Sequence, residues 1–372
     1  MAEFRIPNKI LYGENAAKEL SDINGRRLLL VYDNHLVRDL ALKLLLPSGI
    51  TVRPFEAYSN YADIPQIKEG TKALMEFKPE WVLAAGGHGA IDLAKLIRIF
   101  YQRPELTFQD AADGKAEDIP LDKTSFIVLP IYNTNGGEAT CTAYFANTDM
   151  GFQSEVRNPS LMPDITIIDP SLLVCSNSEQ QALCVLSTFV LAVEAAADTD
   201  SSSFVRPLAL EAISILAKNV PAHSAIPASG ASLLYAQCLA GIAHSNSSPG
   251  LCGALCRAAA HILGHFSFGG LGAVFLPAVI RQDKQADKYL DPARALGLNS
   301  AIALSDAIRE YADMLGLPLT LKEMGVGKNP FLKSLSKISH RALSTLSSPS
   351  LSAGEVQKHI EQILRTSYSS KE

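Results

Sequence analysis

The chain has 372 residues, of which 47% are hydrophobic and 19% are charged, and its formal net charge is −5. This length favours two domains, while the composition and charge are typical of a soluble globular protein and exclude nucleic acid as an expected partner. No membrane partner is expected, because no stretch approaches the roughly 20 apolar residues of a membrane span. The N-terminus lacks a signal-sequence pattern and the six cysteines are scattered, which indicates a cytoplasmic location and reduced thiols.

The first half of the chain alternates short apolar strands with helical patterns, which is typical of a parallel sheet covered by helices. Strands are predicted at residues 27–32, 51–55, 81–85 and 125–130, and helices at residues 36–46 and 64–77 and from residue 90 onward. A polar excursion follows at residues 103–123, and from about residue 171 the pattern changes to long Ala- and Leu-rich helical stretches, such as 179–197 and 208–218. The predicted fold class is therefore α/β plus all-α, with a doubly wound parallel-sheet domain at residues 1–168 and a helical domain at residues 169–372.

A Gly-rich turn, Gly86-Gly87-His88-Gly89, follows the predicted strand 81–85 and precedes a helix. In a doubly wound sheet, ligands bind beyond the carboxyl ends of the strands, where such a turn lets backbone N–H groups approach phosphate at a helix N-terminus. The turn therefore predicts a nucleotide site. Because the spacing is not G-x-G-x-x-G, an ordinary tight turn is an equally weighted alternative.

Asp33 comes directly after the predicted strand 27–32. A carboxylate at that place can accept hydrogen bonds from an adenosine ribose, and it would repel the 2′-phosphate of NADP. Asp33 therefore favours NAD over NADP. The alternative is that Asp33 is the N-cap of the following helix.

Four motifs in order along the chain resemble those of one family. Residues 86–95 are similar to G-G-G-S-x-x-D-x-A-K, and residues 130–140, P-I-Y-N-T-N-G-G-E-A-T, are similar to P-T-T-x-G-T-G-S-E-x-T. Residues 161–170 resemble L-x-P-D…D-P, and residues 240–246 resemble A-G-x-A-F-S-N. The chain thus resembles the iron-containing (group III) alcohol dehydrogenases, within the dehydroquinate synthase-like fold. The resemblance implies a nicotinamide cofactor, NAD or NADP, with these candidate binding residues: Asp33, Gly86, Gly87, His88, Gly89, Asp92, Thr134 and Asn135.

The same resemblance implies that the metal ligands are missing. The family holds a divalent ion with an Asp and a His from D-A-L-T-H-A-I-E and with two His from H-x-x-x-H-P-L-G and a following P-H-G. In this chain Ser187 and Leu191 stand at the first two positions, Arg257 at the third and Phe268 near the fourth. Leu and Phe offer no donor atom, and Arg is a cation that repels a metal ion. No metal is therefore expected at this site.

The nucleotide motifs also depart from the family pattern. His88 stands in place of a Gly and Gly89 in place of a Ser, while Ile131 and Tyr132 replace paired Thr residues. A side chain at His88 would crowd a pyrophosphate or, if it is protonated, attract one.

Hydride transfer without a metal ion needs another positive group beside the substrate oxygen. Arg257 is the predicted group, holding a carbonyl or carboxylate oxygen, with His261 one helical turn on as the proton donor. The alternative is that Arg257 pairs with a carboxylate such as Glu194 and only fills the vacated site. A relocated metal site on His261 and His265 is a further alternative, although Gly264 predicts that the helix ends before it.

Two functions remain open from the sequence. The first is an NAD(P)-dependent oxidoreductase that acts on a small carbonyl or alcohol without the usual metal. The second is a catalytically silent or repurposed family member with a scaffold or regulatory role. Loss of the ligands favours the second function. The first, which we adopt, is favoured by the retained residues Gly86, Gly87, Asp92, Lys95, Gly136 and Glu138. The expected partners are a small-molecule substrate and, since family members commonly assemble, further copies of the chain in a homo-oligomer.

Overall fold

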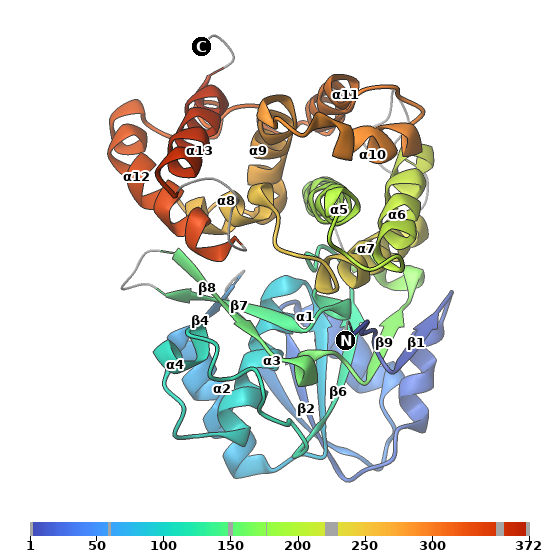
Figure 1. Cartoon of the computed structure of the whole chain (residues 1–372). Coiled ribbons are helices and arrows are strands. Elements are labelled where there is room, and N and C mark those ends of the chain that lie inside the picture. Colours follow the sequence, from blue (N-terminus) through green and yellow to red (C-terminus); the bar gives the residue numbers. More distant parts are fainter. Residues whose placement is uncertain are drawn as a thin grey trace. The chain divides into compact units, whose positions relative to one another are not determined.

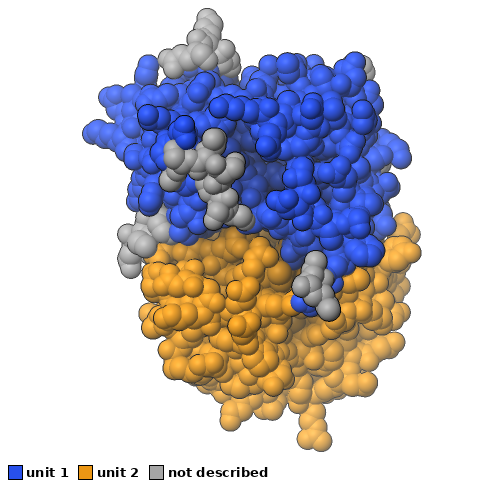
Figure 2. Space-filling view, in the orientation of Figure 1, with its two compact units in different colours: residues 1–4, 151–153, 178–372 blue, residues 5–150, 154–177 orange. Residues whose placement is uncertain are grey.

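The computed structural model describes residues 3–58, 61–147, 152–175, 177–219, 230–346 and 353–369. The chain divides into two compact units, which Figures 1 and 2 show. The α/β unit comprises residues 5–150 and 154–177, and the helical unit comprises residues 1–4, 151–153 and 178–372. The segment 169–177, which follows the domain boundary predicted from the sequence, thus belongs to the α/β unit.

The main sheet of the α/β unit has six strands in the order β1-β9-β6-β5-β2-β3, and every neighbouring pair is parallel. Its strands are β1 (Lys9–Tyr12), β2 (Arg27–Tyr32), β3 (Thr51–Glu56), β5 (Trp81–Gly86), β6 (Ser125–Pro130) and β9 (Ile165–Ile168). A second sheet, in the order β4-β7-β8, is formed by β4 (Ala62–Asp63), β7 (Thr142–Asn147) and β8 (Phe152–Arg157). The predicted doubly wound parallel sheet is confirmed.

The helical segments of this unit connect the strands. They are η1 (Ala16–Asp22), α1 (His35–Leu40), a π-helical segment η2 (Ala41–Leu45), α2 (Ile64–Phe77), α3 (His88–Gln102), α4 (Phe108–Ala112), η3 (Gly137–Ala139), η4 (Pro159–Leu161) and η5 (Pro170–Cys175). The predicted helix 64–77 matches α2, and the helix predicted from residue 90 begins two residues earlier, at His88. The predicted helix 36–46 is divided between α1 and η2, and the polar excursion 103–123 contains α4, which a capping box between Thr107 and Asp110 begins.

Alternate residues of the central strands supply two separate hydrophobic cores, one on each face of the sheet. Val82 and Ala84 of β5 pack into a core with apolar residues of α2 and α3. Leu83 and Ala85, the intervening residues, pack into the core on the other face with residues of η1 and α1. Burial on both faces explains why the strand is an uninterrupted apolar run in the sequence.

The helical unit consists of helices and short turns around a central helix. They are α5 (Ser178–Ala197), α6 (Val205–Asn219), α7 (Gly230–Ser245), α8 (Leu251–Ala259), α9 (Phe268–Gln282), η6 (Ala286–Tyr289), α10 (Leu290–Ala295), α11 (Ala301–Met314), α12 (Lys328–Thr345) and α13 (Ala353–Tyr368). The predicted helical domain is therefore confirmed. Five described cysteines, Cys141, Cys184, Cys238, Cys252 and Cys256, are buried free thiols.

Helix α5 corrects one expectation from the sequence. It has 20 residues, and an 18-residue stretch within it has a mean hydropathy of 1.5, which is long and apolar enough to cross a membrane by length and composition. The expectation that no stretch approaches such a span was therefore wrong. In the folded chain α5 contacts α6, α7, α8, α9 and α10, and 83% of its most apolar 18-residue stretch is buried. A helix surrounded on all sides needs no polar face, so this composition follows from its central position.

Candidate functional site

The Gly-rich turn lies where β5 ends, at Gly86, and α3 begins, at His88. Gly86 has a φ of +146°, and a Cβ added there would collide with the Asp33 carboxylate. A Cβ added to Gly87 would lie 2.5 Å from a ring carbon of Tyr132. Both positions thus require glycine, for conformation at the first and for space at both.

The first turn of α3 has four N–H groups without intrahelical acceptors, and two of them donate to other acceptors of the protein. The Gly87 N–H donates to Asp33 Oδ2 at 2.9 Å, and the His88 N–H donates to the Asn133 carbonyl oxygen at 3.0 Å. The other two N–H groups of this turn belong to Gly89 and Ala90. These are the donors that a bound phosphate would use at this helix N-terminus.

Asp33 is not the N-cap of α1. Asn34 takes that place, since its side chain accepts a hydrogen bond from Leu36 N at 2.8 Å. Asp33 instead accepts from Gly87 N through Oδ2 and from the Tyr132 hydroxyl through Oδ1. Burial raises the pKa of the Asp33 carboxyl, and these two hydrogen bonds oppose that shift. The N-cap alternative is therefore wrong, and the predicted contact with a ribose stays a prediction.

The loop after β6 carries two further predicted cofactor residues. The buried Thr134 hydroxyl donates to Glu138 Oε2, so it stabilises the loop. Asn135 adopts a left-handed conformation with a φ of +51°, and its N–H donates to Asn133 Oδ1 at 3.1 Å. The Asn135 side-chain oxygen is buried and accepts no hydrogen bond from the described residues. A buried acceptor of this kind is ready to bind a donor group of a ligand.

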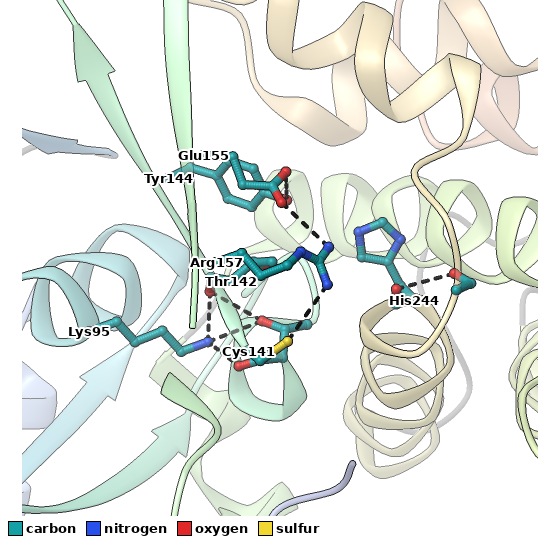
Figure 3. A network of polar contacts seen from close by, with 9 residues as sticks. Lys95, Cys141, Thr142, Tyr144, Glu155, Arg157 and His244 are labelled. Carbon is teal, nitrogen blue, oxygen red and sulfur yellow. Dashed lines mark hydrogen bonds and ion pairs between the residues drawn. The ribbon is translucent and has the colours of Figure 1, made fainter. Parts of the chain in front are cut away.

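Asp92 and Lys95 lie on the buried face of α3. The Lys95 ammonium, which is completely buried, donates to the carbonyl oxygens of Gly137 at 2.7 Å, Thr140 at 2.7 Å and Thr142 at 3.0 Å. Figure 3 shows Lys95 beside Thr142. Burial lowers the Lys95 pKa to about 8, against the attraction of nearby Asp92. Lys95 thus fixes the loop that carries Thr134 and Asn135 to α3, a role that the sequence analysis did not assign to it.

In the helical unit, the positions compared with the family's metal ligands are occupied by groups with other partners. The Ser187 hydroxyl donates to the Cys184 carbonyl oxygen of its own helix at 3.0 Å, and Leu191 is completely buried in the core. The Arg257 guanidinium stacks on the Phe268 ring, 4.8 Å from its centroid. Throughout the described part of the chain, no group of three or more His, Cys, Asp or Glu side chains is arranged to hold a metal ion.

Glu194 of α5 caps the N-terminus of α8. Its carboxylate accepts hydrogen bonds from Cys252 N at 2.5 Å and from Gly253 N at 3.1 Å. Burial raises the Glu194 pKa to about 7, while these two N–H groups and the positive charge of Arg257 favour the ionised form. A Cβ on Gly253 would lie 2.9 Å from both Glu194 Oε2 and Arg257 Nη1, so the carboxylate and the guanidinium lie beside the same glycine. This arrangement supports the alternative that Arg257 offsets the charge of Glu194.

His261 does not lie on the helix of Arg257. Helix α8 ends at Ala259, and His261 is in the turn that follows. Its ring makes an edge contact with His265, with 5.0 Å between the ring centroids. Burial and, to a smaller extent, His265 lower the His261 pKa to about 4, so the imidazole is neutral at physiological pH. The sequence placed His261 one helical turn beyond Arg257, and this placement was wrong because Ala260 and the residues after it leave the helix.

The raised pKa of Glu194 predicts a pH dependence of stability. The folded chain retains the Glu194 proton up to about pH 7, whereas the unfolded chain loses it near pH 4.5, so stability falls as the pH rises through this interval. Relative to Glu194→Gln, the wild type should lose about 1.3 kcal/mol of unfolding free energy between about pH 6 and about pH 8. Urea unfolding of both proteins at the two pH values measures this difference. An unchanged difference would mean that Glu194 ionises with its ordinary pKa.

Comparison with known proteins identifies the family of this chain. The sequence model described as "Iron-containing alcohol dehydrogenase" matches residues 7–170, and the one described as "Fe-containing alcohol dehydrogenase family, C-terminal" matches residues 182–368. The chain belongs to the iron-containing alcohol dehydrogenase family. Among its relatives is an alcohol dehydrogenase of Thermococcus barophilus, 31% identical over 85% of this chain and 82% of the relative.

Other members of the iron-containing alcohol dehydrogenase family are similarly close. An NADPH-dependent butanol dehydrogenase of Clostridium saccharobutylicum is 28% identical over 92% of each chain. The structure of an iron-containing alcohol dehydrogenase from Thermococcus thioreducens matches with a TM-score of 0.86 and 25% identity, over 98% of this chain and all of that chain. The two-domain architecture of the family therefore extends over nearly the whole chain.

Proposed function

We propose that the chain is an NAD(P)-dependent oxidoreductase of the iron-containing alcohol dehydrogenase family that interconverts a small alcohol and a carbonyl compound without the usual metal ion. The observation that supports this most directly is the retained Gly-rich turn at the N-terminus of α3, where neither Gly86 nor Gly87 has room for a side chain. The space beside these glycines is filled by the Asp33 and Tyr132 side chains, so the support for a nucleotide lies in the position of the turn, where a parallel strand ends and the N-terminus of a helix begins.

The residues at this turn fit a dinucleotide. The N–H groups of Gly89 and Ala90 are suited to a phosphate, and the buried Asn135 oxygen is suited to a hydroxyl or amide donor. The Asp33 carboxylate would accept from the adenosine ribose, which favours NAD over NADP. When bound, the nicotinamide would accept or supply the hydride. A relative named NADPH-dependent shows that the family includes members with the other preference.

The side chains at the four inherited ligand positions do not fit a divalent metal ion. Leu191 offers no donor atom, the Ser187 hydroxyl is bonded within its own helix, and Arg257 carries a positive charge. We propose that the Arg257 guanidinium instead binds the substrate oxygen and stabilises the negative charge that develops on it during reduction. A guanidinium in this role favours a substrate with an anionic or strongly polar group.

A fluorescence titration of NADH and then NADPH into protein treated with a strong chelator tests this function. We expect saturable binding without metal, with NADH bound more tightly, followed by turnover of a panel that includes butanol and butanal. Restoring zinc or ferrous ions should leave both results unchanged. Absence of binding by either nucleotide would contradict the proposal and favour the alternative of a catalytically silent or repurposed family member.

A further inference from the structure

We infer that Tyr132 controls nucleotide binding at the Gly-rich turn, because its hydroxyl occupies the carboxylate oxygen of Asp33 that an adenosine ribose would need. This inference rests on the proposed nicotinamide site and adds to it a residue that sets its affinity and selectivity.

Tyr132 lies against the turn on two sides. Its hydroxyl donates to Asp33 Oδ1, and its ring lies so close to Gly87 that a Cβ there would be 2.5 Å from the nearest ring carbon. The other carboxylate oxygen, Asp33 Oδ2, accepts from Gly87 N at 2.9 Å. Tyr132, Asp33 and Gly87 therefore form a closed set of contacts directly at the N-terminus of α3.

Both oxygens of Asp33 are thus engaged by the protein itself. The contact with Gly87 N is compatible with a bound nucleotide, since it belongs to the turn and fixes the carboxylate beside the helix N-terminus. The contact with the Tyr132 hydroxyl is not part of any secondary structure. A carboxylate oxygen can accept two hydrogen bonds, so a ribose hydroxyl that donates to Asp33 Oδ1 must either displace the phenol or share that oxygen with it, and in both cases the phenol weakens the contact with the ribose.

Tyr132 departs from the family pattern, in which a Thr stands at this position. The Thr side chain is shorter, so only the tyrosine of this chain is long enough to contact Asp33 from this loop.

The consequence for selectivity follows from the chemistry of the two nucleotides. NADH presents a 2′-hydroxyl that can replace the phenol as a donor to Asp33, whereas the 2′-phosphate of NADPH is an acceptor that the carboxylate repels with or without Tyr132.

The test is a set of NADH and NADPH titrations with five proteins: wild type, three variants at Tyr132 and Asp33, and one control. Tyr132→Phe keeps the ring against Gly87 and removes only the hydroxyl, so NADH should bind up to about tenfold more tightly while NADPH binding does not improve. Asp33→Asn should reduce the preference for NADH over NADPH. In the double variant, Tyr132→Phe should no longer tighten NADH binding, since the two residues act through one contact.

Tyr144→Phe is the matched control. The Tyr144 hydroxyl donates to Glu155 Oε2 at 3.1 Å in the same α/β unit, so this variant removes a tyrosine–carboxylate contact of the same kind (Figure 3). NADH binding by Tyr144→Phe should stay within about twofold of wild type. Thermal unfolding of each variant establishes that it is folded before it is titrated.

The outcomes separate this inference from the proposed function. Tighter NADH binding by Tyr132→Phe, with Tyr144→Phe unchanged, supports the competition between phenol and ribose. Unchanged or weaker NADH binding by a folded Tyr132→Phe overturns the role of Tyr132 while leaving the nicotinamide site intact. If neither wild type nor any variant binds either nucleotide, the proposed function itself fails, and the inference fails with it.

Discussion

Replacement of Lys95 with methionine is expected to destabilise the protein by about 4 kcal/mol. Methionine fills a similar volume, but it cannot donate to the carbonyl oxygens of Gly137, Thr140 and Thr142, which Lys95 binds in a completely buried place. Each carbonyl would then lose the Lys95 donor in a buried place, and Asp92 would lose the nearby positive charge. Denaturant unfolding followed by circular dichroism measures the change in unfolding free energy.

Lys72→Met is the control for this variant. Lys72 is on the neighbouring helix α2 with a side-chain exposure of 78%, and its nearest acid, Glu76, is 3.9 Å away. An exposed pair of this kind contributes little, so the control should lie within about 0.5 kcal/mol of wild type. If Lys95→Met were as stable as Lys72→Met, the buried ammonium would not be what fixes the loop after β6 to α3.

Arg257→Ala is expected to lower kcat/KM for carbonyl reduction by about 100-fold or more, once a substrate has been found. The guanidinium is the cation proposed to stabilise the developing charge on the substrate oxygen. Arg257→Lys keeps the charge but loses the planar fork, so it should recover part of the activity. Steady-state kinetics with NADH and the responsive aldehyde, together with thermal unfolding of each protein, provide the measurement.

Arg294→Ala is the matched control, since Arg294 lies in the same unit with a side-chain exposure of 69% and pairs with Asp291. It should retain wild-type kinetics. If Arg257→Ala had the same kcat/KM as this control, the structural alternative for Arg257 would be favoured. If Arg257→Ala were less stable, because Glu194 loses its nearby cation, yet turned over substrate normally, Arg257 would only offset the buried carboxylate.

The elements that could be predicted from the sequence are those whose apolar residues are explained by burial alone. Strand β5 is buried on both faces and α5 on all sides, so both are long apolar runs with clear ends. Strands β1, β4, β7, β8 and β9 were not predicted. β1 has only four residues and is half exposed at the sheet edge, and β9 has four residues between the turn residues of a domain-boundary motif. Short strands of this kind are defined by their partners and not by their own composition.

In the candidate site, too, local features could be predicted from the sequence, whereas contacts between distant residues could not. The need for glycine at positions 86 and 87 could be predicted, because only backbone conformation and close approach explain two such residues after a strand. The contact between Tyr132 and Asp33 could not, since it joins residues 99 positions apart through one rotamer of each side chain. The partners of Lys95 are mainly backbone carbonyls, and the residue types at 137 and 142 do not encode where a carbonyl points.

The order of strands in the main sheet has a consequence for synthesis of the protein. Strand β1 is made first, but its neighbour β9 is made last of the six, with Lys9 placed beside Ile165. β9 also lies against the outer side of β6, so one flank of the sheet has no partner until residue 168 has left the ribosome. Contacts at this separation form slowly, and an open strand edge can pair with another nascent chain. Pairing of the N-terminal strand is therefore expected to be among the last steps in folding the α/β unit, and to occur while the helical unit is still being made.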